Sequence, residues 1–116
     1  MRRERAAQIL WVGFMAWVFY AALGPAPEGP EIPHLDKLMH ALCWGFMAAL
    51  CLVAYPGKWR MALGVSAVHG GLTEVMQGTL VQGRSAEWLD WAADLLGAVI
   101  VVASVSWARR RQESAA

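Results

Sequence analysis

The stretch 73–97, TEVMQGTLVQGRSAEWLDWAADLLG, decides how this chain folds, because it places charges within an otherwise strongly apolar sequence. Charged groups in apolar surroundings are costly unless they are paired, and within membrane helices they usually mark functional sites. We therefore expect this stretch to contribute to function. Its charged residues are Glu74, Arg84, Glu87, Asp90 and Asp94.

Length and composition favour a single membrane domain. The chain has 116 residues, of which 58% are hydrophobic and 16% charged, whereas soluble domains are about 45–50% apolar. Uncharged segments cover residues 6–27, 38–57 and 95–108, and Glu74 alone interrupts another at 61–83. Each approaches the roughly 20 residues with which a helix crosses a bilayer. We expect an all-α fold, a four-helix transmembrane bundle with helices at about 7–23, 37–55, 59–81 and 88–108, and a polar cytoplasmic tail at 109–116.

These apolar segments have two other interpretations. A soluble four-helix bundle would show a polar face on every helix, but residues 9–23 and 95–108 are apolar all round. The basic start MRRERAAQ followed by ILWVGFMAWVFYAAL also resembles a signal peptide. Its apolar part is longer than a usual signal core and no small-x-small cleavage site precedes Gly24, so we expect the first helix to be retained.

The distribution of basic residues predicts the orientation. Cytoplasmic segments of membrane proteins carry an excess of Lys and Arg. Only Lys37 and Arg84 fall on one side of the expected bundle. We therefore expect both termini in the cytoplasm of a multi-pass protein of the bacterial inner membrane. The basic residues share no face, so we expect no nucleic-acid partner. Those on the cytoplasmic side are Arg2, Arg3, Arg5, Lys58, Arg60, Arg109, Arg110 and Arg111.

This topology brings polar residues of three helices to the outer end of the bundle. His40 lies near the start of the second helix, Glu74 and Gln77 lie in the last turns of the third, and Asp90 and Asp94 begin the fourth. Spacings of three or four residues keep each pair on one helix face. Small residues at intervals of four around Glu74 form a ridge against which another helix packs closely. These ionisable faces should therefore point into the bundle.

Four short motifs appear in order between residues 33 and 100. They are HLDKLMH at 34–40, Glu74 with Gln77, Arg84, and DWAADLLG at 90–97. Together they resemble the VanZ-like family of small bacterial membrane proteins, whose pattern runs D-K-x-x-H, E-x-x-Q, R and D-x-x-x-N-x-x-G. Asp94 stands where the family usually has Asn. The resemblance implies one multi-helix membrane domain over 1–116 and, for the namesake of the family, low-level resistance to the glycopeptide teicoplanin.

The first functional hypothesis is enzymatic. Carboxylates and one histidine supply acid–base groups or hold a divalent cation, and hard carboxylate ligands suit Mg²⁺ or Mn²⁺ better than a structural zinc. An arginine would bind a phosphate or carboxylate of a lipid-linked substrate. The proposed catalytic residues are Glu74, His40, Asp90 and Asp94; the ligand-binding residues are Asp36, Lys37, Gln77 and Arg84; the metal ligands are Asp36, His40, Glu74, Asp90 and Asp94.

Other hypotheses require no chemistry. The pocket would capture a membrane lipid, a lipid-linked envelope precursor or an amphipathic drug at the outer leaflet. Alternatively, His40, Lys37 and Arg84 would neutralise the acids in a structural ion-pair network, and passage of protons or ions is a further option.

Individual residues also have structural interpretations. Asp36 lies where a helix N-cap is expected, so it is either a cap or an acid of the site. His69 lies off the ridge that contains Glu74, which favours a packing role. Glu87 is expected to be a solvated loop charge.

Overall fold

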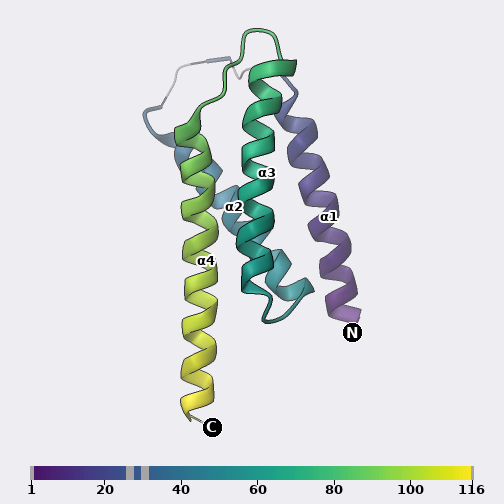
Figure 1. Ribbon diagram of the computed structural model, residues 1–116, viewed down its shortest axis with the longest axis vertical. Helices are drawn as coiled ribbons and strands as arrows, with labels where there is room; N and C mark the ends of the chain where they lie inside the picture. Colours follow the sequence, from purple (N-terminus) through teal and green to yellow (C-terminus); the bar gives the residue numbers. More distant parts are fainter. Residues whose placement is uncertain (1, 26–27, 30–31, 116) are drawn as a thin grey trace.

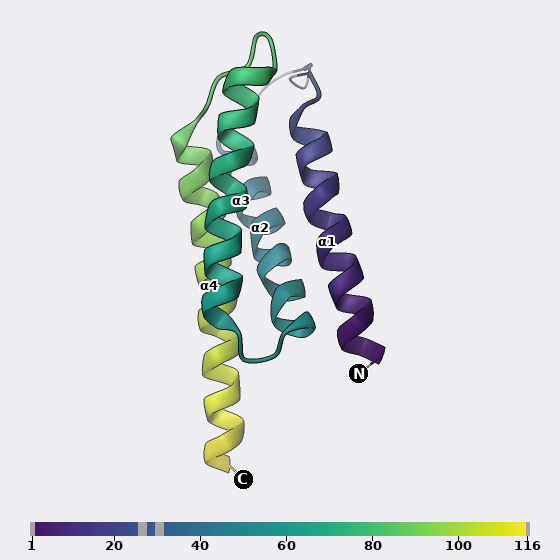
Figure 2. The same cartoon turned by 45° about the vertical axis from the view of Figure 1, so that its right-hand side comes forward.

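The computed structural model describes residues 2–25, 28–29 and 32–115. In these ranges the chain forms four α-helices and no β-strand: α1 (Arg2–Ala22), α2 (Leu35–Ala54), α3 (Trp59–Leu80) and α4 (Trp88–Ala115). Consecutive helices run in opposite directions along one long axis (Figures 1 and 2). The predicted all-α fold with four helices is therefore confirmed.

Both termini and the α2–α3 turn lie at one end of the bundle, and the other two connections lie at the opposite end (Figure 1). All basic residues except Lys37 and Arg84 belong to segments at the terminal end. The helix boundaries differ from the expected ones mainly in α1, which begins at Arg2, and α4, which continues to Ala115 and projects beyond its neighbours (Figure 2). The polar tail at 109–115 is therefore helical.

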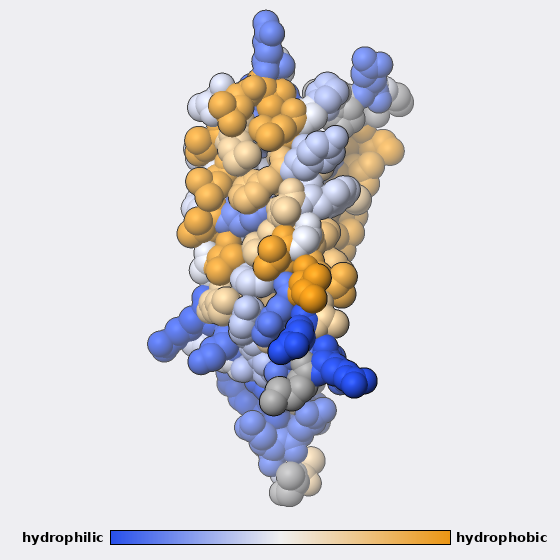
Figure 3. Space-filling view, turned by 90° about the vertical axis from the view of Figure 1, so that its right-hand side faces the viewer, coloured by the Kyte–Doolittle hydropathy of each residue, from blue (hydrophilic) through white to orange (hydrophobic). Residues whose placement is uncertain are grey.

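The bundle hides polar side chains and exposes large apolar ones. Ile9, Leu42, Val68 and Ile100 are examples of exposed apolar residues. Seen from the α1 side, hydrophobic patches are spread over the upper part of the surface, and strongly hydrophilic residues gather toward the end where α4 projects (Figure 3). Soluble bundles show the opposite distribution, whereas a lipid-facing exterior explains this one. The buried polar residues are Ser66, His69, Thr73, Glu74, Gln77, Asp90 and Asp94.

Three of the helices are long and apolar enough to cross a membrane: α1, α2 and α4. With 22 residues α3 is also long enough, but its most apolar stretch of membrane-spanning length is less hydrophobic than those of the other three helices. Most of its polar residues lie on its buried face, while Val68, Leu72 and Val75 are exposed on its outer side. The lower hydrophobicity of α3 thus comes from the polar side chains that it places in the interior of the bundle.

The packing of α2 against α4 is the most extensive contact between helices. A Cβ atom at Gly97 would overlap the backbone carbonyl of Ala41, and one at Gly45 would lie 3.3 Å from the carbonyl oxygen of Gly97. The helix backbones therefore touch at this point. Only a residue without a side chain fits at position 97, as at other small-residue contacts between membrane helices.

Replacing Gly97 by Ala should separate α2 from α4 and destabilise the bundle by about 1–3 kcal/mol, the usual cost of overpacking. Thermal unfolding in detergent measures the effect. Gly64→Ala is the matched control, because Gly64 lies in α3 with open space at its Cβ position. Equal melting temperatures for the two variants would contradict the close approach.

Candidate functional site

Ionisable side chains from three helices and a loop gather at the end of the bundle opposite the termini. We call this group the acidic cluster. Two of its members from α2, Lys37 and His40, stand within hydrogen-bonding distance of residues 50 to 54 positions away in the chain. The cluster consists of Asp36, Lys37, His40, Glu74, Glu87, Asp90 and Asp94.

Lys37 is the only lysine of the cluster and binds three carboxylates. Its Nζ atom lies 2.7 Å from Asp36 Oδ2, 3.1 Å from Glu87 Oε2 and 2.6 Å from Asp90 Oδ1. Asp36 precedes it on α2, Glu87 lies at the end of the α3–α4 loop, and Asp90 lies in the first turn of α4. One ammonium group thus joins the start of α2 to the start of α4.

His40, one turn further along α2, faces both aspartates of α4. Its Nδ1 atom lies 2.7 Å from Asp94 Oδ1, and its Nε2 atom lies 3.5 Å from Asp90 Oδ2. The Trp44 indole is parallel to the imidazole, with ring centres 5.4 Å apart. The stacking and the short contact with Asp94 fix the orientation of the ring.

Glu74 enters the cluster from α3 and is completely buried. Its Oε2 atom accepts a hydrogen bond of 2.9 Å from the backbone N–H of Glu87. The loop can reach Glu74 because Gly78 leaves room for it: a Cβ there would lie 3.0 Å from the Ala86 nitrogen. The α3–α4 loop therefore folds back onto the end of α3.

The cluster changes from an exposed rim to a buried floor. The side chains of Asp36 and Glu87 are 57% and 55% exposed, whereas Asp94 is fully buried. Five carboxyl groups face one lysine and one histidine, so positive charge is in deficit. In the described residues, Glu74 Oε1 and Asp94 Oδ2 are buried without a hydrogen-bond partner. Carboxylates this close repel one another, and a further cation among them would relieve the repulsion. The cluster is thus neither closed nor fully paired.

Gly70 of α3 provides the space for the floor of the cluster. A Cβ at this position would lie 2.8 Å from Asp94 Oδ2, 3.3 Å from Trp44 Nε1 and 3.1 Å from Trp91 Cδ1. Trp44 Nε1 is another buried atom without a partner in the described part of the chain. The Trp91 indole N–H donates to the Ala67 carbonyl at 2.9 Å, which joins α4 to α3 beside the cluster.

Most site residues predicted from the sequence meet here, but two do not share in the contacts above. Arg84 donates a hydrogen bond of 3.1 Å to the carbonyl of Gly24, so its guanidinium ties the α3–α4 loop to the end of α1. Gln77 is buried one turn beyond Glu74. Asp36 is not the N-cap of α2: that position belongs to His34, and Asp36 lies in the first helical turn.

His69 has the packing role that the sequence suggested. Its ring stacks on Phe19 with centres 4.0 Å apart, and Nε2 lies 3.0 Å from the Met15 carbonyl oxygen. It also borders an apolar groove of about 540 Å³ between α1 and α3. Because the acidic cluster does not line this groove, we treat the two as separate features. The lining residues are Phe19, Met61, Gly64, Val65, Val68, His69 and Leu72.

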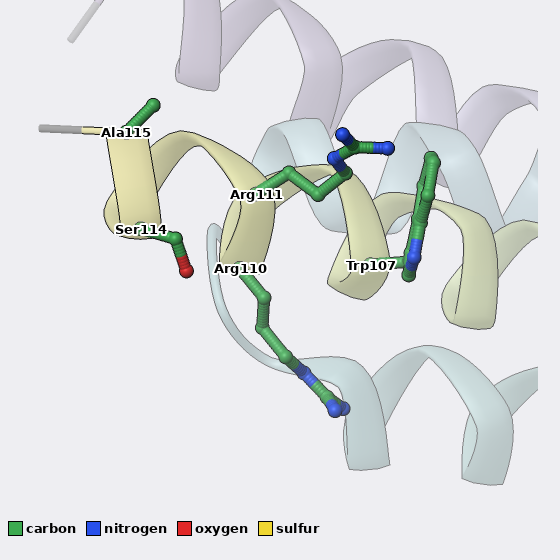
Figure 4. A pocket seen from close by; sticks show the side chains of 5 residues that line it. All are labelled: Trp107, Arg110, Arg111, Ser114 and Ala115. Atoms are coloured by element: carbon green, nitrogen blue, oxygen red, sulfur yellow. The ribbon is translucent and has the colours of Figure 1, made fainter.

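A second hollow lies far from the acidic cluster, on the projecting end of α4. Trp107, Arg110, Arg111, Ser114 and Ala115 line it. The Arg111 guanidinium lies 5.0 Å from the centre of the Trp107 ring, whereas Arg110 extends away from that ring (Figure 4). The arginines that line this hollow and its position on the surface distinguish it from the acidic cluster.

Sequence reasoning missed Glu87 and Trp44. Glu87 is an exposed loop charge, as expected, but its carboxylate also binds Lys37 and its backbone N–H binds Glu74. The sequence did offer a signal for Glu87, because it lies three residues before Asp90, a spacing that places two residues on the same side of a helix start. In the structure the backbone N–H of Asp90 donates to the carbonyl of Glu87. Trp44 follows His40 by four residues, the spacing that places both on one helix face.

Comparisons with known proteins give no relative. No protein-family model matches this chain, and no curated protein or solved structure is significantly similar to it.

Replacing Lys37 by Met should lower the free energy of unfolding by about 1.5–3 kcal/mol, the range for hydrogen bonds to charged groups. The change leaves Asp90 without its cation and keeps the apolar stem. Thermal unfolding in detergent checks this. Lys58→Met at the exposed α2–α3 turn is the control, and an equal loss in both variants would refute a specific role for Lys37.

Proposed function

We propose that the chain is a VanZ-like protein of the bacterial inner membrane, with four membrane-crossing helices and both termini in the cytoplasm. The common position of the termini and of most basic residues at one end supports this orientation. The exposed apolar residues of α3 support its assignment as the fourth span, because its polar residues face its neighbours. The acidic cluster then lies at the outer leaflet.

The acidic cluster in this proposal binds or processes the polar group of an amphipathic molecule, either lipid-linked or glycopeptide-like, with a role in the cell envelope or in resistance of the teicoplanin type. The observation that carries the proposal is the excess of carboxylates in a cluster that extends from exposed side chains, Asp36 and Glu87, to the fully buried Asp94. A positively charged group of a ligand would complete the charge balance. A bilayer supplies the apolar surroundings for the rest of such a molecule.

In the enzymatic form of the proposal, His40, Glu74, Asp90 and Asp94 exchange protons with the ligand. His40 is suited to this because it faces Asp90 and Asp94 through different ring nitrogens. Lys37 and Asp36 lie at the rim, where they would orient the ligand. In the binding form, the same groups hold the ligand unchanged.

A second candidate function is structural. Lys37 connects three carboxylates, and His40 pairs with Asp94, so these contacts join α2 to α4 without any ligand. A purely structural network predicts loss of stability upon mutation and no bound molecule. The unpartnered atoms of Glu74 and Asp94 favour the ligand site, because a finished network would satisfy them.

Mass spectrometry of molecules that co-purify with the protein tests the ligand site. We expect an amphipathic molecule with the wild type, and at least a ten-fold loss of it in Glu74→Gln and in Asp90→Asn, because each removes a negative charge from the cluster. Glu113→Gln, an exposed acid near the other end of α4, should retain it. Incubation with teicoplanin provides a defined probe, and a change in its mass would distinguish processing from binding.

Two results of this experiment would contradict the ligand proposal. One is that all three folded variants co-purify with the same amount of the amphipathic molecule. The other is a lower melting temperature for Glu74→Gln and Asp90→Asn with no bound molecule in any form of the protein, which would favour the structural network.

Orientation has a separate test. After Ala116, a reporter that works only in the cytoplasm should be active. After Gly83, in the α3–α4 loop, a reporter that works only in the periplasm should be active. The reverse pattern would overturn the topology.

A further inference from the structure

We propose that His40, Glu74 and Asp90 bind one divalent cation of the Mn²⁺ class. Each of them offers a ligand atom within 4.8 Å of those of the other two. The three residues come from α2, α3 and α4, so the grouping results from the tertiary fold. This inference does not depend on the amphipathic ligand proposed above.

The second observation is the state of Glu74. Its side chain is completely buried, and Oε1 has no hydrogen-bond partner in the part of the chain that the structure describes. Only Oε2 is satisfied, by the backbone of Glu87. A buried carboxylate oxygen without a donor is costly, and a metal ion would satisfy it.

The contacts of His40 match those of a metal-binding histidine. Such a histidine usually donates one ring N–H to a carboxylate, which leaves the other nitrogen for the metal. Nδ1 lies 2.7 Å from Asp94 Oδ1, and the remaining nitrogen, Nε2, lies 3.5 Å from Asp90 Oδ2. Two ligands each about 2.1 Å from one ion are themselves about 3.0–3.4 Å apart. The observed spacing is close to that of two ligands on one metal and long for a hydrogen bond.

Asp90 can bind Lys37 and a metal together. Its Oδ1 atom accepts the hydrogen bond from Lys37, and Oδ2 faces His40. Asp36, Glu87 and Asp90 form a second group of closely spaced acids, but Lys37 already lies among them within 3.1 Å of each. The ammonium group of Lys37 occupies the position that a metal ion would need in this second group. In the group with Glu74, Lys37 contacts only Asp90 Oδ1, and no lysine of the described residues contacts Glu74 or His40.

The donor set indicates the kind of ion. Carboxylate ligands suit Mg²⁺, Ca²⁺ and Mn²⁺, whereas imidazole is a ligand of transition metals. Mn²⁺ is the transition-metal ion in the first group, so it fits two carboxylates with one imidazole. Three protein ligands also leave coordination positions open, as in catalytic and not in structural metal sites.

Titration of chelator-treated protein with Mn²⁺, followed by electron paramagnetic resonance, tests the site. We expect one ion per chain in the wild type and at least a ten-fold weaker affinity in Glu74→Gln. The loss of a ligand or of its supporting carboxylate typically costs 10–100-fold in affinity. Glu87→Gln should bind within about three-fold of the wild type, because Glu87 is not one of the three ligands and its backbone N–H still binds Glu74. Binding that is lost in Glu87→Gln and kept in Glu74→Gln would place the ion among the rim acids and overturn the proposal.

Pulsed resonance detects an imidazole ligand in the wild type itself, so this central observation does not depend on how a variant folds. With ¹⁵N-labelled histidine, the bound Mn²⁺ should show coupling to an imidazole nitrogen that disappears in His40→Asn and remains in His34→Asn. Absence of the coupling, or of any stoichiometric Mn²⁺ binding at millimolar concentration, would overturn the site. Both measurements are made without an amphipathic ligand, so they can fail or succeed independently of the proposed function.

Discussion

Charged side chains that lie among apolar helices must find their partners within the protein, and this constraint accounts for most of the structure. Lys37 and His40 on α2 reach the acids of α4, and this requires the two helices to be close. The point where the backbones touch supplies that closeness. Ala41 follows His40, and Gly97 lies three residues after Asp94. Packing and electrostatics therefore depend on the same few residues.

The sequence predicted the helices well because their signal is periodic. Long uncharged segments located all four, and intervals of three and four residues correctly indicated that His40, Glu74, Asp90 and Asp94 face inward. The ends were less certain because hydropathy marks a membrane boundary and not the end of a helix. Arginine, glutamine and glutamate are good helix formers, and α4 continues through them to Ala115.

Contacts made by the loops could not be predicted from such intervals. The α3–α4 loop turns at Gly83, whose φ of 80° suits a residue without a side chain, and it then packs over Gly78. That course carries Arg84 toward α1 and the backbone of Glu87 toward Glu74. No periodic pattern specifies either direction. The acidic cluster therefore differs from the predicted site mainly at these two loop residues.

The length of α4 links the two ends of the molecule. From Trp88 to Trp107 an uninterrupted helix rises about 29 Å, close to the roughly 30 Å of hydrocarbon in a typical bilayer. Beyond Trp107 the helix carries three consecutive arginines, which prefer lipid phosphates to the hydrocarbon. In a bilayer, these arginines would hold one end of the rigid helix α4 at the headgroups. The depth of Asp90 at the other end would then follow membrane thickness, so a thicker bilayer would submerge the acids and a thinner one would lift them into water.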